Sequence, residues 1–454
     1  MRSYAILALA VAAGASPCPY GQMAEKGMLS AEDSAKFFAA REKRSKGKES
    51  VITAEIVGRD AEHAAQEQFY KRQLLGGILS LGGGLLGGVL QPFTGVLSGL
   101  GLPTPQEFSL KEIPGDDGAH QYQAPGSTDV RGMCPTLNTM ANHGFISRTG
   151  ITTFAEAAIA CQITLGFGYD TCTFLSALGL LAGGDLPSGK YSIGGADARV
   201  PNTLGPSLGI SKHGFFEVDN SISRQDAYFG NQANFQLARW QRLVNITENY
   251  GGQFGIDTFA EERVLLYDEA KATNPQFDAG TRWLAVTTAE RVFIPRALPN
   301  GTDLNNANFQ NVAPFYLNET FPREWYRRPT PYSLANTGTD IAALLAASSE
   351  LTTPGANEGL GNFVPIGTDI SDITPAQATC FLASAVFDNT PGFLSPALVN
   401  NYATVQAFLS GAVAPFFAGY GCDLNFAEPG PEAGDSTAGV SETCNTLRNG
   451  VYQC

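Results

Sequence analysis

Residues 131–144 read RGMCPTLNTMANHG, and this stretch raises the question of what Cys134 does. Pro135 follows the cysteine directly, and proline suits the first position of a helix because its missing N–H needs no partner there. Gly144 suits the end of the same short helix. Cys134 is therefore predicted at a helix N-terminus, where free N–H groups and the helix dipole favour a thiolate. From these residues alone, a disulfide, an inert core cysteine and a metal ligand all stay open.

The composition is that of a globular, acidic protein. The chain has 454 residues, of which 43% are apolar and 16% charged, and its formal net charge is −14. This length is enough for one large domain or two ordinary ones. An acidic surface argues against binding to nucleic acid or to an anionic membrane, and it favours a soluble protein.

The N-terminus predicts secretion. Residues 1–16 combine a positive residue, Arg2, with an apolar run over 4–13 and small residues before Ser16. This pattern is typical of a signal peptide and is too short to span a bilayer; a buried helix is the alternative. Sequons fit the same route and predict an extracellular glycoprotein. They begin at Asn245, Asn300 and Asn318.

An extension of uncertain fate follows, over residues 17–105. It carries two dibasic pairs, which are read either as processing sites or as solvated helix faces. Its segment 74–103 has no charge and many glycines, each of which costs a helix roughly 0.8–1 kcal/mol against alanine. We expect this segment to be a flexible apolar linker or to pack on the main domain. A membrane hairpin is the minority alternative.

Secretion changes the meaning of the cysteines, because most should be paired in an oxidising compartment. The sequence does not determine connectivity, but proximity and counting leave Cys18 and Cys134 over. If Cys18 lies in a removed segment, Cys134 is the odd thiol; a Cys18–Cys134 disulfide is the alternative. The other six cysteines fall into neighbouring or late pairs: Cys161 with Cys172, Cys444 with Cys454, and Cys380 with Cys422.

Helical periodicity dominates after about residue 106. It is clear over 152–167, 232–252 and 257–275, whereas alternating strand-like runs are scarce. The predicted fold class is all-α, with long ordered loops at 186–212 and 333–372. The expected division of the chain is a signal peptide (1–16), an N-terminal extension (17–105), one multi-helix domain (106–430) and a C-terminal tail (431–454).

The stretch around Cys134 resembles the proximal segment of the heme-thiolate peroxidases, the fungal chloroperoxidases and the unspecific peroxygenases. Further similar segments follow in the same order, so the resemblance covers roughly residues 115–430 and looks closest to the long-type peroxygenases. The matching positions of the family pattern are Cys134, Pro135, Leu137, Asn138, His143 and Gly144, with Met133 in place of its first proline. The further segments read KHGFFEVDNSISRQDAYFGN, EAKATNPQF, AERVFIP and REWYRRPTP.

The resemblance implies a chloroperoxidase-like all-α fold that binds heme b, with Cys134 as the axial ligand of the iron. A thiolate ligand pushes electron density towards iron and favours O–O cleavage. The implied activity is oxidation or oxygenation of small apolar or aromatic compounds by hydrogen peroxide. Two alternatives are a halide-oxidising peroxidase and a heme-binding protein with little turnover. Nucleic acid and membrane are not expected as partners, and the oligomeric state is not predicted.

A second part of the resemblance implies a divalent cation beside a heme propionate. Its ligands would be the Glu217 carboxylate, the backbone carbonyl of Val218 and Ser221. Oxygen ligands of this kind suit Mg²⁺ or Mn²⁺. The alternative is a helix N-cap, because Ser223 and Asp226 have capping-box spacing.

The third part concerns Glu290. Read as a helix, residues 281–295 place this carboxyl in an apolar stripe, where desolvation should raise its pKa. The resemblance implies that Glu290 takes a proton from hydrogen peroxide and returns it to the leaving oxygen; a surface glutamate paired with Arg291 is the alternative. Relatives keep a charge-stabilising arginine seven residues earlier, but that position is Trp283 here, and the arginine, Arg282, is eight residues earlier. The stripe consists of Trp283, Val286, Glu290 and Phe293.

The remaining implied positions are apolar or structural. Phe174, Phe216 and Phe293 match residues that narrow the substrate channel, and aromatic walls suit apolar substrates; plain core residues are the alternative. Cys380 and Cys422 match a late disulfide of the family.

Overall fold

The chain is mostly helical in a computed structural model, which describes residues 100–422 apart from 117, 215, 231, 302, 349–351, 366–372 and 388–400, together with 446–448 and 451–453. These residues belong to one of two units of the chain, Glu62–Cys454, and the other, Met1–Ala61, lies outside them. The predicted signal peptide, Cys18, the dibasic pairs and almost all of the extension also lie outside. No helix in the described ranges is both long and apolar enough to cross a membrane.

The helices predicted from periodicity are confirmed. Helix α6 begins where the Thr153 hydroxyl accepts the N–H of Glu156, and it ends at Gly166, whose φ of 67° favours glycine. Helix α9 ends at Asn274, directly before Pro275. The four elements are α6 (Phe154–Leu165), α8 (Leu237–Thr247), α9 (Ile256–Thr273) and α10 (Thr281–Ala297).

One predicted loop is wrong. Residues 333–372 contain helix α12 (Leu334–Ser348) and the strands β6 (Gly355–Asn357) and β7 (Phe363–Pro365). Glycine and threonine residues weaken the helical signal of α12, but its buried face packs against α9, α10 and helix α13 (Pro375–Phe387). Tertiary packing therefore decides this helix, as it often does where propensity is weak. Residues 186–212, in contrast, are mostly irregular, as predicted.

The strands are short, with two or three residues each. The sheets are β1 (Lys111–Glu112) with β5 (Tyr326–Arg327), β2 (Ile151–Thr153) with β3 (Lys190–Ser192), β4 (Asp278–Ala279) with β6 and β7, and β8 (Thr446–Arg448) with β9 (Val451–Gln453), all antiparallel. The remaining helices are α5 (Pro135–Asn142), α7 (Tyr169–Gly183), α11 (Phe309–Leu317), α16 (Tyr402–Ala412) and α17 (Ala414–Phe417), with 3₁₀ turns η1 (Leu186–Ser188), η2 (Ala227–Phe229), η3 (Glu248–Tyr250) and η5 (Ala418–Tyr420).

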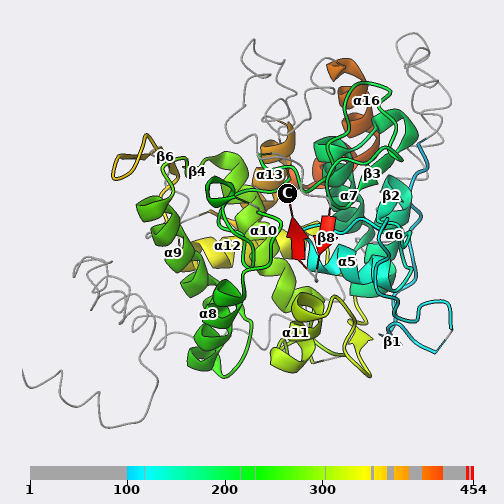
Figure 1. The fold of residues 1–454 in the computed structure, drawn as a ribbon, viewed down its shortest axis with the longest axis horizontal. Coiled ribbons are helices and arrows are strands. Elements are labelled where there is room, and N and C mark those ends of the chain that lie inside the picture. Colours follow the sequence, from blue (N-terminus) through cyan, green and yellow to red (C-terminus); the bar gives the residue numbers. More distant parts are fainter. Residues whose placement is uncertain are drawn as a thin grey trace, which may run out of the picture. The chain divides into compact units, whose positions relative to one another are not determined.

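Helix α10 is central to the core. It packs against α9, α12 and α13, while α6 pairs with α7, and α5 contacts α11. Figure 1 shows α10 between the α9–α12 group and the region of α5 to α7. One face of α10 therefore packs against α9, α12 and α13, and the opposite face points towards α5.

The loop before Cys134 is fixed by hydrogen bonds to Asn138 and packs closely against the backbone of Ile193. The Asn138 side chain accepts a hydrogen bond from the N–H of Gly132 at 2.9 Å and donates one to the carbonyl of Gly132 at 2.8 Å. One amide side chain therefore binds both backbone polar groups of Gly132. A Cβ atom on Gly132 would lie 1.8 Å from the carbonyl oxygen of Ile193. Only glycine fits here without a shift of the backbone.

We therefore predict that Gly132→Ala lowers the free energy of unfolding by about 2 kcal/mol or more, because the loop must move away from Ile193. Urea unfolding of the purified protein measures this. Gly411→Ala is the control, since its added Cβ meets nothing within 4 Å and alanine favours the surrounding helix α16. Superimposable unfolding curves for Gly132→Ala and the parent protein would contradict the prediction.

Candidate active site

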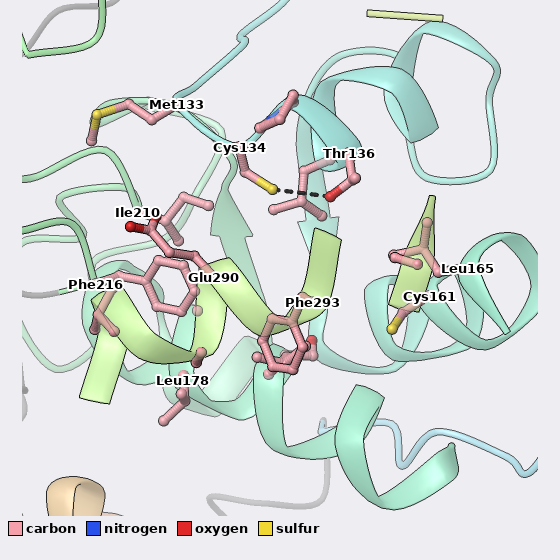
Figure 2. A pocket seen from close by; sticks show the side chains of 18 of the residues that line it. Met133, Cys134, Thr136, Cys161, Leu165, Leu178, Ile210, Phe216, Glu290 and Phe293 are labelled. Carbon is pink, nitrogen blue, oxygen red and sulfur yellow. Dashed lines mark hydrogen bonds between the residues drawn. The ribbon is translucent and has the colours of Figure 1, made fainter. Parts of the chain in front are cut away.

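Cys134 is the N-cap residue of α5, as the sequence predicts, with extended backbone angles (φ −79°, ψ 111°) and Pro135 at the start of the helix. Its Sγ lies 3.2 Å from the Thr136 hydroxyl (Figure 2). Burial raises the pKa of the Cys134 thiol, while hydrogen bonds from Thr136 and the Leu137 N–H, and the charge of Arg224, act in the opposite direction. The site thus offers a thiolate both N–H donors and a positive charge.

The other described cysteines are paired. Cys161 bonds to Cys172, and Cys380 bonds to Cys422, which confirms the late disulfide that the resemblance implies. Among the described residues, Cys134 is the free cysteine. Cys18, Cys444 and Cys454 lie outside the residues that the structure describes.

The rest of the RGMCPTLNTMANHG stretch supports the position of the thiol. Arg131 donates from Nε to the side chain of Asn142 at 2.8 Å. The buried His143 hydrogen-bonds through Nδ1 to the carbonyl of His120 at 2.7 Å and through Nε2 to the Thr320 hydroxyl at 2.9 Å. Both ring nitrogens of His143 are occupied, so this histidine is a structural residue.

Glu290 projects from α10 into the same pocket as Cys134 (Figure 2). Its Oε1 accepts a hydrogen bond from Arg291 Nη1 at 2.7 Å. Burial raises the pKa of Glu290 to about 7, the charge of Arg291 opposes this shift, and the charge of Glu262 adds to it. Glu290 is therefore paired with Arg291, but in a pocket and not as a surface residue.

Trp283 and Arg282, which precede Glu290 on α10, are not among the residues that line the pocket. Trp283 is buried against Tyr267 and Phe277 and does not line the pocket, so it leaves the predicted stripe. Arg282 interacts with Asp278 and His213: burial lowers the pKa of the Arg282 guanidinium against the effect of Asp278, and burial together with the charge of Arg282 lowers the pKa of His213 to about 4. The guanidinium that contacts Glu290 is that of Arg291.

Glu217 and Ser221 both line the pocket, and Val218 is buried beside them. Burial raises the pKa of Glu217 well above its usual value, the charge of Glu290 adds to the effect, and Arg224 opposes it. Within the described residues, no three His, Cys, Asp or Glu side chains are grouped as a metal site. The expected set of one carboxylate, one carbonyl and one hydroxyl contains a single side chain of these types.

The capping-box alternative for this segment is wrong. Ser223 begins no helix, and the turn η2 that follows Asp226 has no side-chain cap. Asp226 Oδ1 instead accepts the N–H of Asn220 at 3.1 Å and pairs with Arg239 at 3.0 Å. The acidic side chain at 226 therefore holds the loop that carries Glu217 and Ser221.

The pocket encloses about 270 Å³, with mostly apolar walls from α5, α6, α7 and α10. Phe174, Phe216 and Phe293, the predicted channel residues, all line it. The walls also contain residues that sequence reasoning did not single out. Tyr316 stacks on Trp240, with the two ring centroids 4.8 Å apart. The Cys161–Cys172 disulfide forms part of the pocket wall that α6 and α7 provide.

The sequence indicates no role for Arg224, Glu262 or Tyr316, and it offers Arg291 only as the partner of a surface glutamate at 290. No motif marks them, because they act through spatial neighbours on other elements. The one available signal is the pair Glu290–Arg291 itself. Charged residues are rarely buried unless they are paired, so a carboxylate beside an arginine in an otherwise apolar stripe indicates an ion pair.

The residues present fit a bound heme. A free sulfur at a helix N-terminus opens onto an apolar pocket, which suits a thiolate ligand and a macrocycle. The buried Ser211 hydroxyl on the pocket wall has no hydrogen-bond partner among the described residues. An unpartnered polar atom beside an apolar pocket fits an occupant with both apolar and polar parts.

We predict that digestion of the alkylated, unreduced protein yields a modified Cys134 peptide. Two disulfide-linked pairs, Cys161–Cys172 and Cys380–Cys422, should appear in the same peptide map. Mass spectrometry before and after reduction makes the assignment, with reduced and alkylated protein as the control. A cross-linked Cys134 peptide would exclude the thiolate site.

Comparison with known proteins agrees with this geometry. Residues 120–330 match the family described as "Peroxidase, family 2". The dothistromin biosynthesis peroxidase of Dothistroma septosporum is 28% identical over 348 residues, which cover 69% of this chain and 83% of that protein. An aromatic peroxygenase of Cyclocybe aegerita is 29% identical over 280 residues (60% and 73%), and a chloroperoxidase of Leptoxyphium fumago is 43% identical over 269 residues (53% and 66%). The chain is related to the heme-thiolate peroxidases and is a hydrogen-peroxide-dependent oxidoreductase.

Proposed function

We propose that this protein is a secreted peroxygenase that uses hydrogen peroxide to oxygenate or oxidise small apolar or aromatic compounds. One observation carries the proposal: the free sulfur of Cys134 and the carboxyl of Glu290 line one pocket whose walls are otherwise mostly apolar. Relatives named aromatic peroxygenase support the substrate class.

Cys134 would hold the heme iron, and the bound heme supplies the oxidising chemistry. The protein's own part is to keep the sulfur in place and ionised. Asn138 holds the loop before Cys134, and the N-terminal N–H groups of α5 face the sulfur. These contacts require no movement when the ligand bond forms, which is how preorganised sites stabilise charge.

Glu290 is the group that we assign to proton transfer. Oε1 is occupied by Arg291, so Oε2 is the oxygen that takes the proton from hydrogen peroxide and returns it to the leaving oxygen. A carboxyl with a pKa of about 7 exchanges protons readily near neutral pH. The pocket walls limit access of water, and Phe174, Phe216 and Phe293 hold the substrate by apolar contact.

We extend the proposal to a divalent cation, Mg²⁺ or Mn²⁺, held by Glu217, the carbonyl of Val218 and Ser221. A buried carboxyl whose pKa is raised gains most from a cation, because the cation favours its charged form. Such ions take about six oxygen ligands, so a heme propionate and water would complete the set.

Secretion and the division into signal peptide, extension (17–105), domain (106–430) and tail (431–454) belong to the same proposal. The candidate glycosylation sites differ in structure: Asn245 and Asn318 are exposed, whereas the Asn300 amide donates to the carbonyl of Glu324 at 3.0 Å. We therefore assign glycans to Asn245 and Asn318.

Halide oxidation is the second candidate activity, because the chloroperoxidase relative is similar over 269 residues. Both activities would use Cys134 and Glu290. Product analysis with an aromatic substrate, with and without chloride or bromide, separates them: halogenated products support halide oxidation, and oxygenated products in both conditions support oxygen transfer.

We predict that Glu290→Gln lowers the rate of peroxide-dependent oxidation about 100- to 10,000-fold, because glutamine cannot accept the proton. The rate with a phenol or an aromatic substrate measures this. An unchanged Soret spectrum in Glu290→Gln serves as the control for heme binding. Equal rates in the two proteins would remove Glu290 from the mechanism.

The pH dependence follows from the same carboxyl. The base form of Glu290 is required, and burial raises its pKa to about 7, so activity should increase as pH rises through this value. Below it, kcat/KM for peroxide should fall about tenfold per pH unit. Steady-state rates between pH 4 and about 9 check this prediction. An acid limb at the ordinary glutamate pKa would contradict it.

A further inference from the structure

A buried chain of charges connects Glu290 to a second helix. Arg291 Nη1 donates to Glu290 Oε1 at 2.7 Å. On its other side, Arg291 donates from Nε to Glu262 Oε2 at 2.6 Å and from Nη2 to Glu262 Oε1 at 3.1 Å. Arg291 is fully buried and Glu262 nearly so. Two carboxylates, from α9 and α10, therefore share one guanidinium.

The guanidinium has no freedom to move. Besides the two carboxylates, Arg291 donates to the carbonyl of Thr287 at 2.9 Å and to the carbonyl of Asn220 at 2.9 Å. These contacts make five hydrogen bonds, the full number that an arginine side chain can donate. The Asn220 bond also ties α10 to the loop that carries Glu217.

The two carboxylates are bound unequally. Glu262 takes two parallel bonds in the bidentate geometry that suits a guanidinium best, whereas Glu290 takes a single bond. Glu262 therefore holds the larger share of the positive charge, and Glu290 is left as the carboxyl whose proton is exchanged most easily.

We propose that Glu262, acting through Arg291, is a positioning residue that fixes the Glu290 carboxyl and sets its proton affinity. The inference rests on the proposed acid–base role of Glu290 and deepens it. It assigns to Arg291 the support that relatives obtain from an arginine seven residues earlier on the helix, and it adds a counter-carboxylate on α9.

Other ionisable groups interact with Glu290 or Arg291, and together they determine the direction in which the pKa of Glu290 should shift in each variant. Arg291 favours the charged form of Glu290, and Glu262 disfavours it. Glu217 of the loop and Tyr316 of α11 also interact with Glu290, and Arg263 of α9 interacts with Arg291. Because Glu262 is the nearest negative partner of Arg291, its neutralisation should leave more positive charge to Glu290.

The decisive variant is Glu262→Gln, which keeps the side-chain volume and an acceptor oxygen for Arg291. In the heme-loaded enzyme, the acid limb of kcat/KM for peroxide should move to lower pH by about 0.5–1 unit. Arg291→Gln should move it to higher pH by about 1 unit or more. Infrared titration of the Glu290 carboxyl, identified by its absence in Glu290→Gln, should report the same two opposite shifts without relying on turnover.

Glu261→Gln is the matched control, because Glu261 is an equally buried carboxyl next in the chain that accepts a hydrogen bond from the Tyr250 hydroxyl at 2.8 Å. It should lower the unfolding midpoint without moving either titration. Equal shifts in Glu261→Gln and Glu262→Gln, or no shift in Glu262→Gln, would overturn the proposal. So would a shift in Arg282→Gln with none in Glu262→Gln.

The outcomes also separate this inference from the proposed function. If Glu290→Gln retains full activity, the acid–base assignment fails, and the infrared titration still decides whether Glu262 controls the Glu290 carboxyl. If Glu290→Gln is inactive but Glu262→Gln titrates like the parent enzyme, the inference alone fails. Should Arg291→Gln not fold, Glu262→Gln carries the test.

Discussion

The pocket between α5 and α10 is mostly apolar, so each ionisable group at its edge depends on a partner that the protein provides from behind it. The Cys134 sulfur has the N–H groups at the start of α5 and the charge of Arg224. Glu290 has Arg291. Because desolvation penalises the charged forms, these partners control whether sulfur and carboxyl ionise at neutral pH. The chemistry of the site therefore depends on the hydrogen bonds and charges around these two groups.

The departure at residue 283 shows how the core accommodates such a change. Trp283 fills space beside Tyr267 and Phe277, and the guanidinium of Arg263 lies 4.8 Å from its ring centroid. A tryptophan thus brings packing area at the position where the family resemblance implies a charge. One residue on a helix corresponds to about 100° of rotation, and the charge of Arg282 interacts with Asp278 and His213. Arg291 meets Glu290 because its side chain is long enough to reach the carboxyl of its neighbour.

Much of the fold could be predicted from periodicity, and the exception has a physical cause. Helix α8 has a clear apolar face, and α6, α8 and α9 have recognisable ends, whereas α12 contains glycine and threonine residues that weaken its local signal. Its contacts with α9, α10 and α13 supply the stability that its propensity does not. Periodicity over one segment cannot report contacts with helices distant in sequence.

For the site, the sequence by itself determined the local features: Cys134 as an N-cap residue before Pro135, and a carboxyl at 290 on a helix. Local features follow from short-range rules of capping and helical rotation. Only the tertiary structure decided which guanidinium meets Glu290 and that Glu262 stands behind it. These contacts join residues of two helices, 29 positions apart for Arg291 and Glu262, and a one-residue shift along α10 turns a side chain to a different neighbour.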